Sequence, residues 1–100
     1  MAKEPLPAEF KLMQNYPNPF NGETTIKFAL PKNDRVSLEI YNALGQKVKT
    51  LINNDNMEAG YYTMKWNGTN NNHISVASGV YFYQLSTDHT RIVKRLVYTK

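Results

Sequence analysis

Two closely spaced prolines constrain this chain more than any other feature, in the stretch Asn15-Tyr16-Pro17-Asn18-Pro19-Phe20-Asn21. Each proline fixes its own φ angle and removes a backbone donor, and each pushes the residue before it toward an extended conformation. The stretch is therefore not helical, and a disordered tether would not need its two aromatic residues. We expect a fixed loop, named here the proline segment (residues 15–21), whose Tyr16 or Phe20 plugs one end of a β-domain.

After the proline segment, apolar and polar residues alternate, as they do in strands that bury one face. This pattern predicts six strands, over residues 26–30, 36–41, 46–52, 61–66, 80–85 and 91–99. Turn residues separate them, including a polar loop at 53–56 and a tight connection at 42–45 in which Gly45 supplies a positive φ. No segment keeps a 3.6-residue period. We predict an all-β fold, an immunoglobulin-like antiparallel β-sandwich of about six to seven strands.

Three aromatic residues are predicted to anchor the core of this sandwich: Trp66, Tyr81 and Tyr83. Alternation puts both tyrosines on the inward face of their strand. We expect Val80 and Phe82, on the other face of the same strand, to be covered by a neighbouring strand or by the proline segment.

Two strands are less regular. Between residues 46 and 52, Leu51 falls on the face opposite to Val48 and Ile52, which a β-bulge would reconcile. The last strand carries apolar residues on both faces around Lys94-Arg95, so it is either covered on both sides or bulged. For Tyr61 and Tyr98, strand propensity is a sufficient explanation.

Composition excludes several classes of protein. One hundred residues suggest one domain. The absence of cysteine excludes disulfides and thiolate zinc sites, and no apolar run reaches the ~20 residues of a membrane-spanning helix. The net charge is +4, but the lysines of the predicted strands stand singly at alternate positions. Nucleic-acid binding requires a basic patch or stripe, so we predict no nucleic-acid partner.

The sequence shows no arrangement of residues that would support catalysis. The eight acidic residues are scattered, and His73 and His89 lie in separate loops without ligand spacing. Neither a G-x-S-x-G turn nor a phosphate-binding glycine loop is present. The loops at 53–56 and 67–72 could hold calcium through amide and carbonyl oxygens, but only Asp55 there is charged. We predict no catalytic residue, no metal site and no cofactor.

Residues 10–100 resemble the C-terminal sorting domain of proteins exported by the bacterial type IX secretion system. The resemblance lies in the proline segment and in a series of later motifs: Thr25-Ile26-Lys27-Phe28, Ile40-Tyr41-Asn42, Trp66-Asn67-Gly68, Ser78-Gly79-Val80-Tyr81-Phe82-Tyr83 and Lys94-Arg95-Leu96-Val97. The same sandwich is similar to the Ig-like domain of flagellar hook-capping proteins.

The resemblance implies a sorting signal that is not an enzyme. An upstream cargo domain would be exported through the periplasm, recognised at the outer-membrane translocon, and delivered to the cell surface or released. A sortase-like peptidase would cleave within a linker at residues 1–14, ahead of the domain at 15–100. The implied recognition residues are Tyr16, Pro17, Asn18, Pro19, Phe20, Asn21, Lys94, Arg95, Leu96, Val97 and Lys100.

The chain departs from the family pattern at two places. Gly22 stands where the family often continues with proline, and Asn67, Asn70 and His73 stand where it favours acidic residues and a glycine. Met1-Ala2-Lys3 suggests a piece cut from a longer protein. Two alternatives stay open: a structural Ig-like spacer or hook-cap-like module, and a carbohydrate-binding module. The second is disfavoured because alternation turns Trp66 inward.

Overall fold

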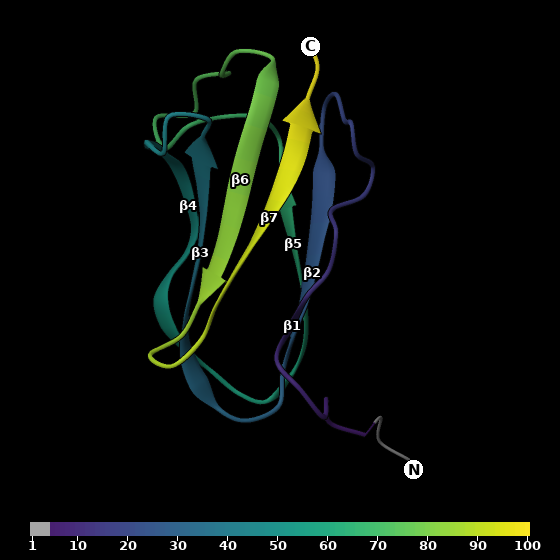
Figure 1. The fold of residues 1–100 in the computed structure, drawn as a ribbon, viewed down its shortest axis with the longest axis vertical. Helices are drawn as coiled ribbons and strands as arrows, with labels where there is room; N and C mark the ends of the chain where they lie inside the picture. The colour runs from purple at the N-terminus through teal and green to yellow at the C-terminus, as the bar shows by residue number, and fades with distance from the viewer. Residues whose placement is uncertain (1–4) are drawn as a thin grey trace.

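The computed structural model describes residues 5–100, and these form seven strands in two antiparallel sheets (Figure 1). The first sheet has the order β1-β2-β5 and the second the order β4-β3-β6-β7. The strands are β1 (Lys11–Leu12), β2 (Thr24–Leu30), β3 (Asp34–Asn42), β4 (Lys47–Met57), β5 (Gly60–Trp66), β6 (Gly79–Ser86) and β7 (Arg91–Tyr98). The prediction of an all-β sandwich is confirmed.

The core lies between the two sheets and follows the period of two. In β2 the side chains of Ile26, Phe28 and Leu30 are buried, and Lys27 between them is exposed. The same alternation buries Tyr81 and Tyr83 in β6. Trp66, at the end of β5, is 1% exposed. All three predicted core anchors are therefore in the core.

The prediction of a polar loop at residues 53–56 is wrong. These residues continue β4, which runs to Met57 and pairs with the start of β3, so that Arg35 lies opposite Asn56. Their side chains are exposed because β4 is at the edge of its sheet. Asn54 has a φ of 53°, a conformation that asparagine tolerates better than most residues. The predicted bulge is confirmed, since the register of β3 and β4 shifts at three points.

The last strand is neither bulged nor covered on both sides. Its register with β6 is continuous, from Gly79 opposite Tyr98 to Ser86 opposite Arg91. Leu96 and Tyr98 face the core, whereas Val93 on the other face is 51% exposed. The expectation that Val80 is covered is wrong, because it is 37% exposed on that same outer face.

The segment before residue 15 is partly built into the fold. Lys11 and Leu12 form β1 and pair with Ala29 and Phe28 of β2. Leu12 belongs to the core, and Phe10 packs against it. Of the predicted linker, residues 1–4 lie outside the described residues.

Candidate recognition site

Phe20 is the residue of the proline segment that plugs the sandwich. Its side chain is 2% exposed, whereas Tyr16 is 80% exposed. The Phe20 ring centroid lies 5.0 Å from that of Tyr98 and 5.6 Å from that of Trp66, and Trp66 lies 5.5 Å from Tyr81. Tilted aromatic pairs at these separations are favourable. These four rings form what we call the end cluster.

Tyr98 is a member of the end cluster that the sequence analysis missed. Strand propensity explained its aromatic character, but the position opposite Gly79 in the continuous register places it inward. A Cβ atom added at Gly68 would lie 2.5 Å from the Tyr98 ring, and the φ of Gly68 is +75°. The motif Trp66-Asn67-Gly68 therefore supplies one ring of the cluster and the space for another.

A buried polar network fixes the start of the proline segment. The Asn15 amide group donates to Thr24 Oγ1 (3.0 Å) and to the Pro17 carbonyl (3.2 Å), and the Thr24 hydroxyl donates to the same carbonyl (2.8 Å). Asn15 and Thr24 are both buried, so these bonds replace contacts with water that burial removes. The bonds Tyr16-Pro17 and Asn18-Pro19 are both cis.

The hydroxyl of Tyr83 ties the same region to the opposite sheet. It donates to the Met13 carbonyl (2.7 Å) and accepts from the backbone N–H of Asn15 (2.9 Å). Burial raises the pKa of Tyr83 to about 12, against a smaller lowering by the hydrogen bond from Asn15. A phenylalanine at this position would leave both backbone groups without this partner.

The proline segment also lies along the outer edge of β7. The N–H of Phe20 donates to the Val97 carbonyl (3.0 Å), and the N–H of Thr99 donates to the Phe20 carbonyl (2.8 Å). Asn18 Oδ1 accepts from the N–H of Val97 (2.9 Å), and the Gln14 amide donates to the Arg95 carbonyl (2.8 Å). The two regions implied as recognition elements are therefore in direct contact.

This contact limits how β7 could join a partner sheet. β7 is an edge strand, and an edge strand can pair with an added strand. At residues 95–99, however, its outer edge is already bonded to residues 14–20. A partner strand could pair there only after the proline segment leaves.

The predicted recognition residues divide into two groups by exposure. Phe20 and Leu96 are buried in the core. The others are exposed or half-buried in the folded domain: Tyr16, Pro17, Asn18, Pro19, Asn21, Lys94, Arg95, Val97 and Lys100. The backbone of Tyr16 is held by two hydrogen bonds to Thr25, of 3.0 and 2.9 Å, so its exposed ring projects from a fixed position.

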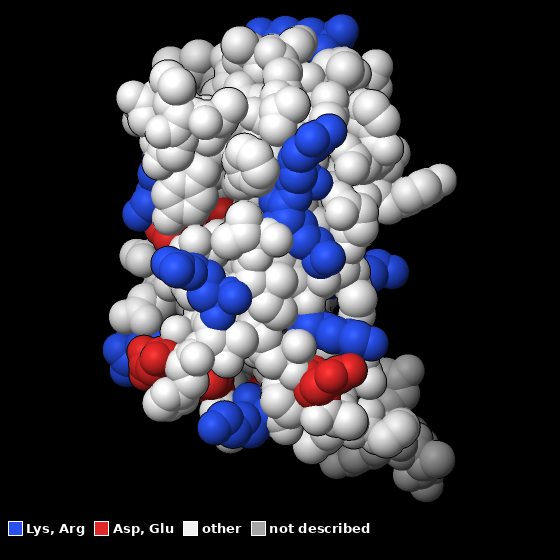
Figure 2. Space-filling view, viewed as in Figure 1, with Lys and Arg blue, Asp and Glu red and all other residues white. Residues whose placement is uncertain are grey.

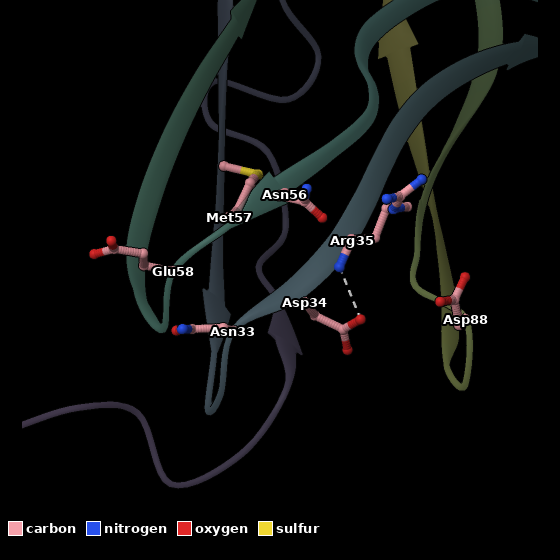
Figure 3. Close-up of a pocket in the computed structure, with 7 residues that line it drawn as sticks. All are labelled: Asn33, Asp34, Arg35, Asn56, Met57, Glu58 and Asp88. Carbon is pink, nitrogen blue, oxygen red and sulfur yellow. Dashed lines mark hydrogen bonds between the residues drawn. The ribbon is translucent and has the colours of Figure 1, made fainter.

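Acidic residues line a hollow at the opposite end of the sandwich, but their carboxyl groups do not point toward one common position (Figure 3). Asp34 Oδ1 accepts from the N–H of Arg35 (2.8 Å). Glu58 follows β4 and Asp88 follows β6, and in Figure 3 the two lie on opposite sides of the hollow, with Glu58 pointing away from it. Within residues 5–100, no group of three or more His, Asp or Glu side chains is placed to hold a metal ion.

The asparagines of the loop after β5 use their side-chain oxygens within the protein. Asn70 Oδ1 accepts from the N–H groups of Asn72 and Ile74, and Asn71 Oδ1 accepts from the N–H of Thr50 in β4. This loop is therefore bonded to β4 through groups that a calcium ion would require. No helix in the described part of the chain is long and apolar enough to cross a membrane.

The chain is similar to two solved proteins of Porphyromonas gingivalis. One is dimeric latent PorU, with a TM-score of 0.69 and 18% identity; the match covers 92% of this chain and 10% of PorU. The other is PorZ, a bacterial surface component of the type-IX secretion system, with a TM-score of 0.55 and 21% identity over 91% of this chain and 11% of PorZ. This chain thus spans about a tenth of each, and the likeness shows a shared fold.

No curated protein sequence matches the chain. The family described as the secretion system C-terminal sorting domain, however, matches residues 14–99. That range runs from just before the proline segment to just after β7 and includes the end cluster. This chain therefore belongs to the family of C-terminal sorting domains of the type IX secretion system.

Proposed function

We propose that the type IX translocon reads this sorting domain at the end of the sandwich where the proline segment lies against β7. The supporting observation is the set of hydrogen bonds that joins Asn18 and Phe20 to Val97 and Thr99. A surface fixed in this way loses little conformational entropy when a partner binds. A translocon that accepts many cargo proteins needs such a feature, since the sorting domain is what those proteins share.

The proposed contact residues are those of the predicted set that a partner can reach. They are Tyr16, Pro17, Asn18, Pro19, Asn21, Lys94, Arg95, Val97 and Lys100. Phe20 and Leu96 act from the core, by fixing the proline segment and β7 in contact. We assign no catalytic role to the domain.

A reporter with its own signal peptide, fused ahead of this chain in a type IX host, tests the proposal. The fusion is expected at the cell surface or in the medium after transit through the periplasm, and the reporter alone is expected to stay in the periplasm. The exposed pair Tyr16→Ala and Asn21→Ala should reduce export, whereas the exposed control pair Tyr61→Ala and Asn53→Ala should not. Equal export of all fusions would contradict the proposal.

The proposed cleavage by a sortase-like peptidase falls ahead of β1. Proteases act on extended, accessible backbone, and Lys11, Leu12 and Met13 are hydrogen-bonded or paired to β2. The mass of the exported reporter should therefore show a new C-terminus within residues 1–10. A C-terminus within 11–14 would contradict this position.

After cleavage, we propose that the cargo is attached at the cell surface or released. The spacer and carbohydrate-binding alternatives find less support. The ring of Trp66 is buried, so it is not available to stack on a sugar.

A further inference from the structure

The outer face of β6 and β7 is unusually apolar for a sheet face in water. Val80 and Val97 lie opposite each other, as do Phe82 and Arg95, and Gln84 and Val93. Val80 and Val93 are exposed, and Phe82 and Val97 are half-buried. Alternating strands of a sandwich normally place polar residues on this face.

The outer face of β2 and β5 provides a comparison within the same molecule. There the register places Thr25 opposite Lys65, Lys27 opposite Thr63 and Ala29 opposite Tyr61, so that face is polar over its first two pairs, and Tyr61 is its exposed aromatic residue. Strand propensity would act on both faces equally. The apolar residues on β6 and β7 therefore require another explanation, such as a partner.

Basic side chains adjoin these apolar residues. Arg91 and Arg95 are exposed on the same face of β7. Among residues 5–100, the ion pairs are Lys11–Glu9, Lys47–Glu39 and Lys65–Glu23, so neither arginine is neutralised by one of them. In Figure 2, blue side chains lie down the middle of the view and along both of its sides, and most of the red ones lie in the lower half.

This face contains a shallow hollow. It is lined by Tyr41, Phe82, Gln84, Arg91 and Val93, with the turn after β3 at its rim. Glu39, which lies opposite Gln84, is already bonded to Tyr41 Oη (3.1 Å) and to Lys47 Nζ (2.6 Å). The charge left for a partner is therefore that of the arginines.

The proline segment extends the same surface. Phe20 pairs in parallel with Tyr98 and faces inward, and its neighbours Pro19 and Asn21 are exposed beside the end of β7. A standard interface buries ~800 Å² per partner, and Pro19 and Asn21 extend the apolar face of β6 and β7 toward an interface of that kind.

We propose that the outer face formed by Val80, Phe82, Val93 and Val97 with Arg91 and Arg95 is a docking surface that continues the proposed recognition site, with which it shares Arg95 and Val97. Its occupant is a protein surface of the type IX translocon that has an apolar centre flanked by carboxylates. Apolar burial supplies the affinity, and the arginines supply attraction and orientation. The inference rests on the proposed function.

Direct binding to the purified, detergent-solubilised translocon tests this surface. The variant with Arg91→Glu and Arg95→Glu should bind about 10-fold more weakly or worse, because two charges then repel the partner. The matched control, Lys27→Glu with Lys65→Glu, makes the same change of charge on the other sheet and should bind within about twofold of the original. Val93→Ser, which keeps the charge, should also weaken binding. Thermal unfolding of each variant verifies that it is folded.

The outcomes separate this inference from the proposed function. Failure of the unaltered domain to bind the translocon and to direct export would overturn both. Export and binding by the unaltered domain, with the arginine variant equal to the lysine control, would overturn the docking surface and remove Arg95 from the proposed contact residues, while the rest of the proposed function would stand. Vesicles of phosphatidylglycerol form the last arm of the test. If the arginine variant loses binding to vesicles but not to the translocon, the face binds an anionic lipid surface and the inference is wrong.

Discussion

At the scale of single residues, the sorting domain depends on side chains whose type is set by one close contact. Gly68 leaves room for the ring of Tyr98, and Tyr83 places a hydroxyl between two backbone groups. Neither contact can be read from a local pattern, because the partners are 30 and about 70 residues apart in sequence. Each contact gives a prediction about stability.

Gly68→Ala should destabilise the domain far more than Gly45→Ala. Both glycines have a positive φ, of +75° and +81°, but a Cβ atom at Gly45 meets nothing within 4 Å, whereas one at Gly68 meets the Tyr98 ring. Backbone strain costs about 1–2 kcal/mol at either site, and overpacking adds about 1–3 kcal/mol at Gly68. Chemical denaturation of both variants measures the difference. Equal losses would mean that Tyr98 moves aside without cost.

The buried hydroxyl of Tyr83 should make the domain lose stability at high pH. Its pKa is raised to about 12 in the folded state, above the ~10 of an unfolded chain. The folded state therefore holds a proton that the unfolded state releases between these values. Stability is fully present below pH 10 and falls as pH rises toward 12, by up to about 2–3 kcal/mol. Burial also raises the pKa of Tyr81, which adds to the loss with the same sign.

Tyr83→Phe isolates this effect. The variant should be less stable than the original at pH 8 by about 1–3 kcal/mol, because Met13 and Asn15 lose a buried partner. Its stability should then fall less steeply above pH 10. Urea unfolding at pH 8, 10 and 11 measures both slopes, and parallel slopes would assign the alkaline loss to other tyrosines.

At the scale of elements, the contact between the proline segment and β7 divides the outer edge of that strand into two parts. Hydrogen-bonding directions alternate along an antiparallel strand. Val93 and Val97 therefore turn their N–H groups to the same edge, away from β6. The N–H of Val97 is bonded to Asn18. The N–H of Val93 is farther along the strand, where the proline segment does not extend.

Amide hydrogen exchange should reveal this division. The amide of Val93 should exchange rapidly, while those of Val97 and Thr99 should be protected by residues 18–20. Asn18→Ala should reduce the protection of Val97 but leave that of Leu96, whose N–H faces β6. The control Asn21→Ala changes an exposed neighbouring side chain and should leave both unchanged. A protected Val93 amide would contradict the open lower edge.

The sequence predicted the strands in which apolar and polar residues alternate regularly. It did not predict the end of β4, which forms a strand by pairing although its composition is that of a loop. The period of two located the core of β2, β3 and β6. Asn53-Asn54-Asp55-Asn56 has the composition of a loop, yet it forms the end of β4 because Asp34–Val36 offer it a paired partner and its side chains face water. The motif residues of the proline segment were evident from the sequence. Their contact with β7 was not, since it joins residues about 80 apart.

At the scale of the whole molecule, the first and last parts of the domain meet at one end and close it together. Figure 1 shows the loop before β2 beside the upper part of β7. A translocon that contacts this end would contact both parts at once, and only in a folded domain. Under the proposed function, recognition would be coupled to folding through the end cluster, and substitution of an exposed residue of the proline segment would change recognition without changing folding.

Substitutions of the two aromatic residues of the proline segment should separate the effect on folding from the effect on recognition. Phe20→Ala removes a buried ring and should cost about 3–5 kcal/mol, lowering the unfolding midpoint and reducing export because less folded domain is present. Tyr16→Ala removes an exposed ring and should leave the free energy of unfolding within about 0.5 kcal/mol of the original, yet weaken binding to the translocon. Unfolding curves and translocon affinity, measured on the same preparations, give both quantities. A Tyr16→Ala variant with unchanged stability and unchanged affinity would remove this ring from the recognition surface, and the buried residues would then be the part of the motif that matters.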